Sequence, residues 1–189
     1  MMRQFPHYKK HQRGVGIIEV LVALVVVSLG VLGMANLQLT GIKHSNSGYN
    51  RAKALMVAGS ITSRMRANRA GVLAGNYNAY SFTSSGTTCS VRPNPYCQTL
   101  GTTAAQSCSV EQLATYDLFS ASCGNWGATE NADGGVQDYL PLGATLDVNC
   151  DDATCTPMST YTVAVTWPES QNASNDADST HRVQIRFRP

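Results

Sequence analysis

Six cysteines are the residues of this 189-residue chain whose type and number most plainly indicate chemistry. The gaps between successive cysteines are 7, 10, 14, 26 and 4 residues. No CxxC pair occurs, and structural zinc sites usually use closely spaced pairs, so we expect three disulfide bonds and no metal site. Fifteen connectivities are open, and we expect neighbours along the chain to pair: Cys89 with Cys97, Cys108 with Cys123, and Cys150 with Cys155.

No group of residues forms a recognisable catalytic site. The four histidines are His7, His11, His44 and His181. None of them converges in the sequence with a Cys or Ser in a pattern that suggests a nucleophile and its base. Phosphate-binding loops and dinucleotide fingerprints are absent from the sequence. Asp176 and Asp178 alternate as in a calcium loop, but the required Gly and closing Glu are missing, so residues 175–180 read as a solvated hairpin loop. The sequence predicts neither an enzyme nor a bound cofactor.

Glu19 is an acid at the start of a long apolar segment. From Val20 to Ile42 there is no charged side chain over 23 residues. At about 1.5 Å per helical residue, this stretch crosses the roughly 30 Å hydrocarbon core of a bilayer. Residues 1–14 carry four basic residues and no acid, a net charge of +4, and the next basic residue is Lys43. We therefore expect the N-terminus in the cytoplasm and the cysteines in an oxidising compartment outside it.

Glu19 also discriminates between interpretations of this segment. An ordinary membrane anchor and a secretory signal, with a possible cut at Gly33-Met34-Ala35, are the two general alternatives. A carboxylate in an apolar segment costs several kcal/mol unless it is paired, and secretory apolar regions usually span only about 7 to 15 residues. A partner for Glu19 is therefore expected.

Gly14, the run Val15-Gly16-Ile17-Ile18-Glu19 and the apolar stretch after it resemble the leader of type IV prepilins. The resemblance implies that a prepilin peptidase cuts between Gly14 and Val15 at the cytoplasmic face and methylates the new amine of Val15. The carboxylate of Glu19 could then neutralise that amine between packed helices and set the register of assembly. The alternative is that Glu19 lies at the headgroup boundary of the membrane. On this interpretation the chain comprises a cleaved leader (1–14), a membrane and assembly helix (15–42) and a periplasmic domain (43–189).

The apolar segment and the later sequence RMRANRAG are similar to PilV-type minor pilins, the type IV pilus modification proteins. This resemblance implies a subunit of the bacterial inner membrane and the pilus that helps to initiate assembly, sits at or near the tip, and supports twitching motility and adhesion. The implied partners are other minor pilins, the major pilin, the prepilin peptidase and a tip adhesin. Two alternatives remain: a type II secretion pseudopilin, and a tip module that binds a surface, a sugar or DNA through residues 71–135.

The remaining pattern predicts an α+β domain. Nothing but single glycines interrupts a helix from Asn36 to about residue 70. Two apolar stripes follow helical spacing along this helix. One consists of Ala52, Leu55, Met56 and Gly59, and the other of Ala54, Ala58, Ile61 and Met65. One stripe could hold the chain's own sheet and the other a neighbour, or both stripes could belong to the core. Residues 71–140 are expected to be surface loops, with a short helix at 110–119 and a strand or two. Alternating residues in 160–167 and 182–188, with a third segment at 145–149, predict an antiparallel sheet on the helix, which is also the pilin fold.

Charge is unevenly distributed between the predicted elements. The helix carries six basic residues and no acid after residue 42: Lys43, Arg51, Lys53, Arg64, Arg66 and Arg69. Eleven of the twelve acids fall between Glu111 and Asp178. Tyr49 is the only aromatic residue among these bases and no nucleic-acid-binding motif accompanies them, so no nucleic acid is expected. The helix bases are expected to pair with the acidic stretch, within the domain or in a neighbouring subunit.

Overall fold

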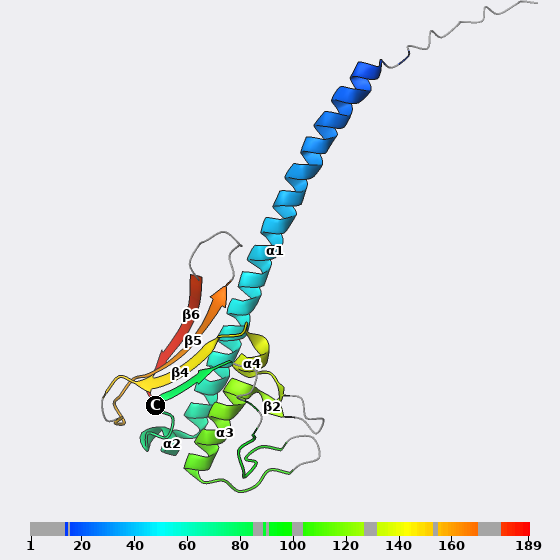
Figure 1. The fold of residues 1–189 in the computed structure, drawn as a ribbon. Helices are drawn as coiled ribbons and strands as arrows, with labels where there is room; N and C mark the ends of the chain where they lie inside the picture. Colours follow the sequence, from blue (N-terminus) through cyan, green and yellow to red (C-terminus); the bar gives the residue numbers. More distant parts are fainter. Residues whose placement is uncertain are drawn as a thin grey trace, which may run out of the picture. The chain divides into compact units, whose positions relative to one another are not determined.

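The computed structural model describes residues 14, 16–84, 89, 91–99, 104–126, 132–152, 155–169 and 179–189 (Figure 1). The predicted leader before Gly14, residue Val15 and the acidic residues of the loop at 175–178 lie outside the described residues. The chain divides after Ser45 into two units, 1–45 and 46–189, which are treated separately below.

The described elements are four helices and six strands. In chain order they are α1 (Ile17–Ala67), α2 (Arg69–Leu73), β1 (Tyr80–Thr83), α3 (Val110–Cys123), β2 (Asn125–Trp126), β3 (Ala132–Asp133), α4 (Gly135–Tyr139), β4 (Thr145–Cys150), β5 (Tyr161–Glu169) and β6 (Ser179–Phe187). Four strands form an antiparallel sheet in the order β1-β4-β5-β6, and β2 pairs with β3 in a small separate ladder.

Helix α1 ends at Ala67, three residues before the predicted end. Asn68 leaves the helical conformation, with φ −97° and ψ 54°, and its side-chain oxygen accepts a hydrogen bond from the Gly71 N–H at 3.2 Å. This contact caps the short helix α2. A Cβ on Gly71 would lie 2.5 Å from Nδ2 of Asn68, so the cap requires glycine at position 71.

The three predicted C-terminal strands are confirmed. Val163 of β5 lies between Val148 of β4 and Ile185 of β6 in the ladder register. The inward side chains of β5 are at most 2% exposed, as the period-two alternation requires. They pack in one core with the buried side chains of α1 from residue 54 onward. The α+β pilin-like fold expected from the sequence is therefore present.

The prediction that residues 71–140 form a loop-rich surface is wrong for much of this stretch. Tyr77, Phe82, Leu118 and Val136 are all buried in the core. Strand β1 adds a fourth strand to the sheet, and α3 continues to Cys123 instead of ending at residue 119. A capping box fixes the start of α3, because Ser109 and Gln112 each bond the other's backbone N–H.

Two of the three expected disulfide pairings are also wrong. The structure joins Cys89 to Cys123 and Cys97 to Cys108, and only the expected pair Cys150–Cys155 is present. Helix α3 explains the difference, because its 14 residues separate Cys108 from Cys123 by about 20 Å along the axis. A disulfide requires Cα atoms less than about 7 Å apart. The segment that begins at Cys89 is instead attached near both ends of α3.

Candidate assembly site

The start of α1 is the part of the predicted processing site that the structure describes. Gly14 and Gly16 are exposed, and the helix begins at Ile17. The backbone N–H of Glu19 donates to the carbonyl of Gly16 at 3.0 Å, so Glu19 lies in the first helical turn. A carboxylate is favoured there because the helix dipole is positive at its N-terminus. Its exposed side chain lies about one helical turn from position 15 in the sequence.

The first half of α1 is an apolar surface. Its large apolar side chains between Ile17 and Ile42 are all exposed, from 49% for Val20 to 83% for Ile17. By length and composition, α1 is one helix capable of crossing a membrane. The hydroxyls of Ser28 and Thr40 donate to helix carbonyls four residues earlier, at 2.7 and 3.0 Å. These polar groups are satisfied within the helix, as an apolar surrounding requires.

From Asn46 onward, α1 presents two different faces to its surroundings. Ala54, Ala58, Ile61 and Met65 have no exposed surface and form part of the core. Leu55 and Met56 on the other stripe are 46% and 61% exposed. Of the two alternatives for these stripes, the structure supports the one in which a single stripe packs on the chain's own domain, and it contradicts the one in which both are core. The outward stripe is open within the described part of the chain.

A buried polar network connects α1 to α3. Nη1 of Arg64 lies 3.2 Å from Oδ1 of Asp117, which is 3% exposed, and also bonds the side chain of Gln98 at 3.3 Å. The Tyr77 hydroxyl donates to Oδ2 of Asp117 at 2.6 Å and accepts from Nδ2 of Asn68 at 3.1 Å. One of the helix bases is thus paired with the acidic stretch inside the domain, as expected from the charge distribution.

Tyr77 holds its proton tightly in this network. Burial is the main cause that raises the pKa of its hydroxyl above the ordinary value of 10.0, and the adjacent carboxylate of Asp117 raises the pKa further. The hydroxyl therefore remains a donor to Asp117. Sequence spacing did not reveal this network, although Ala114, Leu118 and Ala121 flank Asp117 at helical intervals and could have indicated that it faces the core.

A shallow groove of about 210 Å³ lies between α1, α3 and α4. Met56, Ser60 and Arg64 of α1 line one side of it. Near this groove, Nζ of Lys53 lies 4.4 Å from the ring centre of Tyr49 and 4.9 Å from that of Tyr139. Within the described ranges, no three His, Cys, Asp or Glu residues come close enough to hold a metal ion.

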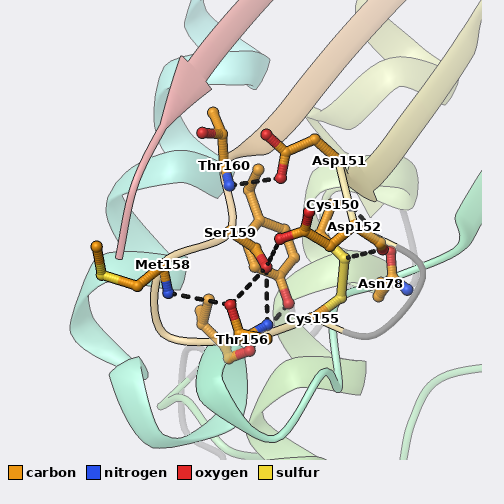
Figure 2. Close-up of a disulfide and its surroundings, with 11 residues drawn as sticks. Asn78, Cys150, Asp151, Asp152, Cys155, Thr156, Met158, Ser159 and Thr160 are labelled. Atoms are coloured by element: carbon orange, nitrogen blue, oxygen red, sulfur yellow. Dashed lines mark hydrogen bonds between the residues drawn. A yellow bond between two sulfur atoms is a disulfide. The ribbon is translucent and has the colours of Figure 1, made fainter.

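Asp151 and Asp152 lie in the turn between β4 and β5 that the disulfide Cys150–Cys155 closes, and both bond to other groups of that turn (Figure 2). Oδ1 of Asp151 accepts from the Thr160 N–H at 2.7 Å. Asp152 accepts from the hydroxyl of Ser159 at 2.5 Å. These carboxylates stabilise the turn through local hydrogen bonds, so the arrangement indicates a structural role.

Comparison with known proteins gives two adjoining family matches. Residues 9–35 match a prokaryotic N-terminal methylation motif, and residues 36–119 match the Tt1218-like family, described as type IV pilin Tt1218. Neither the curated proteins nor the solved structures contain a significant match. The two matches together cover more than half of the chain and agree with the fold and with the exposed apolar helix. These matches, together with the fold, support a type IV pilin.

Proposed function

We propose that this pilin is a PilV-type minor subunit that enters the pilus through the apolar half of α1. The observation that carries the proposal is the apolar, exposed first half of α1, with Glu19 in its first turn. The Gly14-Val15 junction and Glu19 both lie inside the matched methylation motif. Type IV pilins are a structural family, which supports a role without catalysis. In this role the chain helps to initiate assembly, lies at or near the tip, and supports twitching motility and adhesion.

The proposed life cycle begins in the inner membrane, with the N-terminus in the cytoplasm and the domain from residue 43 onward in the periplasm. The prepilin peptidase removes residues 1–14 and methylates the amine of Val15. Other minor pilins, the major pilin and a tip adhesin are the proposed partners. Packing of apolar helices removes Glu19 from water, and the amine of Val15 on the same or a neighbouring subunit neutralises it.

Processing is tested by the intact mass and N-terminal sequence of the membrane-extracted protein, from cells with and without a prepilin peptidase. We expect N-methylated Val15 only where the peptidase is present. A start at Asn36 would identify a secretory signal instead, and a start at Met1 or Met2 in both strains would identify an ordinary anchor. Either result would contradict the pilin processing.

Assembly is tested by replacing Glu19→Gln and measuring the ratio of filament-bound to membrane-bound protein. An unpaired buried charge costs several kcal/mol, and each 1.4 kcal/mol is a tenfold change, so we expect incorporation to fall more than about tenfold. Membrane insertion should persist. Glu111→Gln, which changes another exposed carboxylate, is the matched control and should be incorporated normally. Equal incorporation of both variants would refute the role of Glu19, and co-purification with secretion proteins instead of pilus proteins would favour a pseudopilin.

A further inference from the structure

The connection between α4 and β4 is a tight turn that exposes a leucine. Leu142 is 72% exposed, whereas Leu140 and Ala144 on either side of it are buried. The Ala144 N–H donates to the carbonyl of Pro141 at 3.1 Å, which closes the turn. Gly143 lies at φ 88°, a conformation in which a larger residue would be strained. The backbone of this turn therefore presents the Leu142 side chain to the surroundings of the domain.

Ser84, which directly follows β1 and is 2% exposed, holds this turn in place. Its N–H donates to the carbonyl of Ala144 at 2.8 Å, and its carbonyl accepts from the Gly143 N–H at 3.2 Å. Its hydroxyl donates to the carbonyl of Pro141 at 3.3 Å and accepts from the Ala144 N–H at 3.0 Å. A turn fixed in this way avoids the ordering cost that binding imposes on a loose loop. Leu142 thus has the support expected of an apolar anchor.

The turn lies at the end of the domain at which α1 enters it (Figure 1). Strand β5 begins at the opposite end, because the hydroxyl of Tyr161, its first residue, donates to the carbonyl of Val72 in α2 at 2.9 Å. Nine residues of β5 span about 30 Å. A Cβ on Gly143 would lie 3.7 Å from Cγ of Pro168, so the turn lies beside the far end of β5.

Tyrosine and lysine side chains gather at the same end of the domain. Nζ of Lys53 in α1 lies 4.4 Å from the ring centre of Tyr49 and 4.9 Å from that of Tyr139. Tyr139 is the last residue of α4, three residues before Leu142, and Tyr49 is 59% exposed. Both residue types combine an apolar body with a polar tip and are favoured where lipid meets water. These four residues, Tyr49, Lys53, Tyr139 and Leu142, are called the entry face below.

The entry face follows the apolar segment closely along the chain. Tyr49 comes seven residues after Ile42, the last residue of the charge-free run, and both belong to helix α1. Seven helical residues rise about 10 Å. The headgroup region of a bilayer extends about 5 to 8 Å beyond its hydrocarbon core. Side chains of a helix lean toward its N-terminus, so the Tyr49 ring is directed back toward the apolar segment. A bilayer that holds this segment is therefore within reach of the entry face.

We propose that, while α1 anchors the chain in a membrane, the entry face docks on the surface of the same bilayer. Leu142 then enters the boundary between headgroups and acyl chains, and the tyrosines lie among the headgroups. Because the anchor keeps the face beside the bilayer, its effective concentration there is high and weak contacts suffice. Burial of one leucine favours the docked state by about 10- to 100-fold. The proposal rests on the membrane anchoring of α1 and not on incorporation into a pilus.

Tryptophan fluorescence tests the proposal on the full chain, reconstituted in phosphatidylcholine vesicles whose acyl chains carry bromine, which quenches tryptophan on contact. Leu142→Trp is the reporter, and the unsubstituted chain in the same vesicles gives the background of Trp126 and Trp167. We expect the added fluorescence to be quenched, more strongly by bromine near the headgroups than by bromine deep in the chains. Absence of quenching at position 142 would overturn the proposal.

Met158→Trp is the matched control for the reporter. Met158 is 69% exposed, like Leu142, but it lies in the turn before β5, at the opposite end of that strand (Figure 2). Its tryptophan should not be quenched, because a domain docked through the entry face holds this turn away from the lipid. Equal quenching at positions 142 and 158 would indicate adsorption without a preferred face and would refute the proposal.

Two further variants separate the failure of this proposal from the failure of others. Leu32→Trp, near the middle of the charge-free run, should be quenched most strongly by deep bromine. Absence of that quenching would contradict the membrane anchor itself and, with it, the docking. Leu142→Ser should enter filaments normally, because the docking precedes assembly. Loss of incorporation by Leu142→Ser, without quenching at position 142, would assign the turn to a neighbouring subunit and overturn the proposal.

Discussion

At the scale of single residues, Tyr77 and Asp117 are the polar groups on which the domain depends most. Both are buried, and their contacts connect α1, the turn after α2 and α3. A buried acceptor that loses a donor incurs much of its desolvation penalty. The network therefore fixes how α3 lies on α1, while the surrounding apolar side chains supply most of the favourable burial.

Tyr77→Phe tests this network and its pH dependence together. We expect the free energy of unfolding to fall by about 1 to 3 kcal/mol at pH 7, because Oδ2 of Asp117 loses its hydroxyl donor. The raised pKa of Tyr77 means that the folded state keeps a proton which the unfolded state releases above pH 10, so wild-type stability falls as the pH rises beyond 10. The variant should lose stability less steeply over that window.

Urea unfolding followed by circular dichroism, at pH 7 and at pH values from 9 to 11, measures both effects. Tyr49→Phe is the control, because Tyr49 is 59% exposed and its ring contact with Lys53 does not need the hydroxyl. An identical pH dependence of the unfolding free energy for wild type and Tyr77→Phe would contradict the raised pKa of Tyr77 as the cause of the stability loss above pH 10.

At the scale of elements, α1 combines a core-forming stripe with an open one from Asn46 onward. Ile61→Ala should reduce the unfolding free energy by about 2 to 5 kcal/mol, because Ile61 is fully buried and the change leaves a cavity. Met56→Ala, on the open stripe of the same helix, should change it by less than about 0.5 kcal/mol. Chemical denaturation of both detergent-solubilised variants checks the prediction, and similar losses would show that the open stripe also packs against the domain.

At the scale of the whole molecule, the disulfides differ in how much chain they restrain. Cys89–Cys123 closes a separation of 34 residues and Cys150–Cys155 one of only 5. Loop-closure entropy predicts that removing the first bond, by paired Cys→Ala changes, costs about 4 kcal/mol and removing the last about 2. Thermal unfolding of the two paired variants under oxidising conditions gives the comparison. A larger loss of stability on removal of the Cys150–Cys155 bond would mean that local contacts, and not chain entropy, determine how much each disulfide stabilises the domain.

The sequence alone determined the features that depend on local pattern. The charge-free run after Glu19 specified the apolar helix, and the period-two alternation in β5 and β6 specified which residues enter the core, because burial follows backbone periodicity. The tertiary structure decided what depends on contacts distant in the chain: the pairing of Cys89 with Cys123, the addition of β1 to the sheet, and the meeting of Arg64 with Asp117. Such contacts depend on how α3 and the sheet dock on α1, which no local spacing encodes.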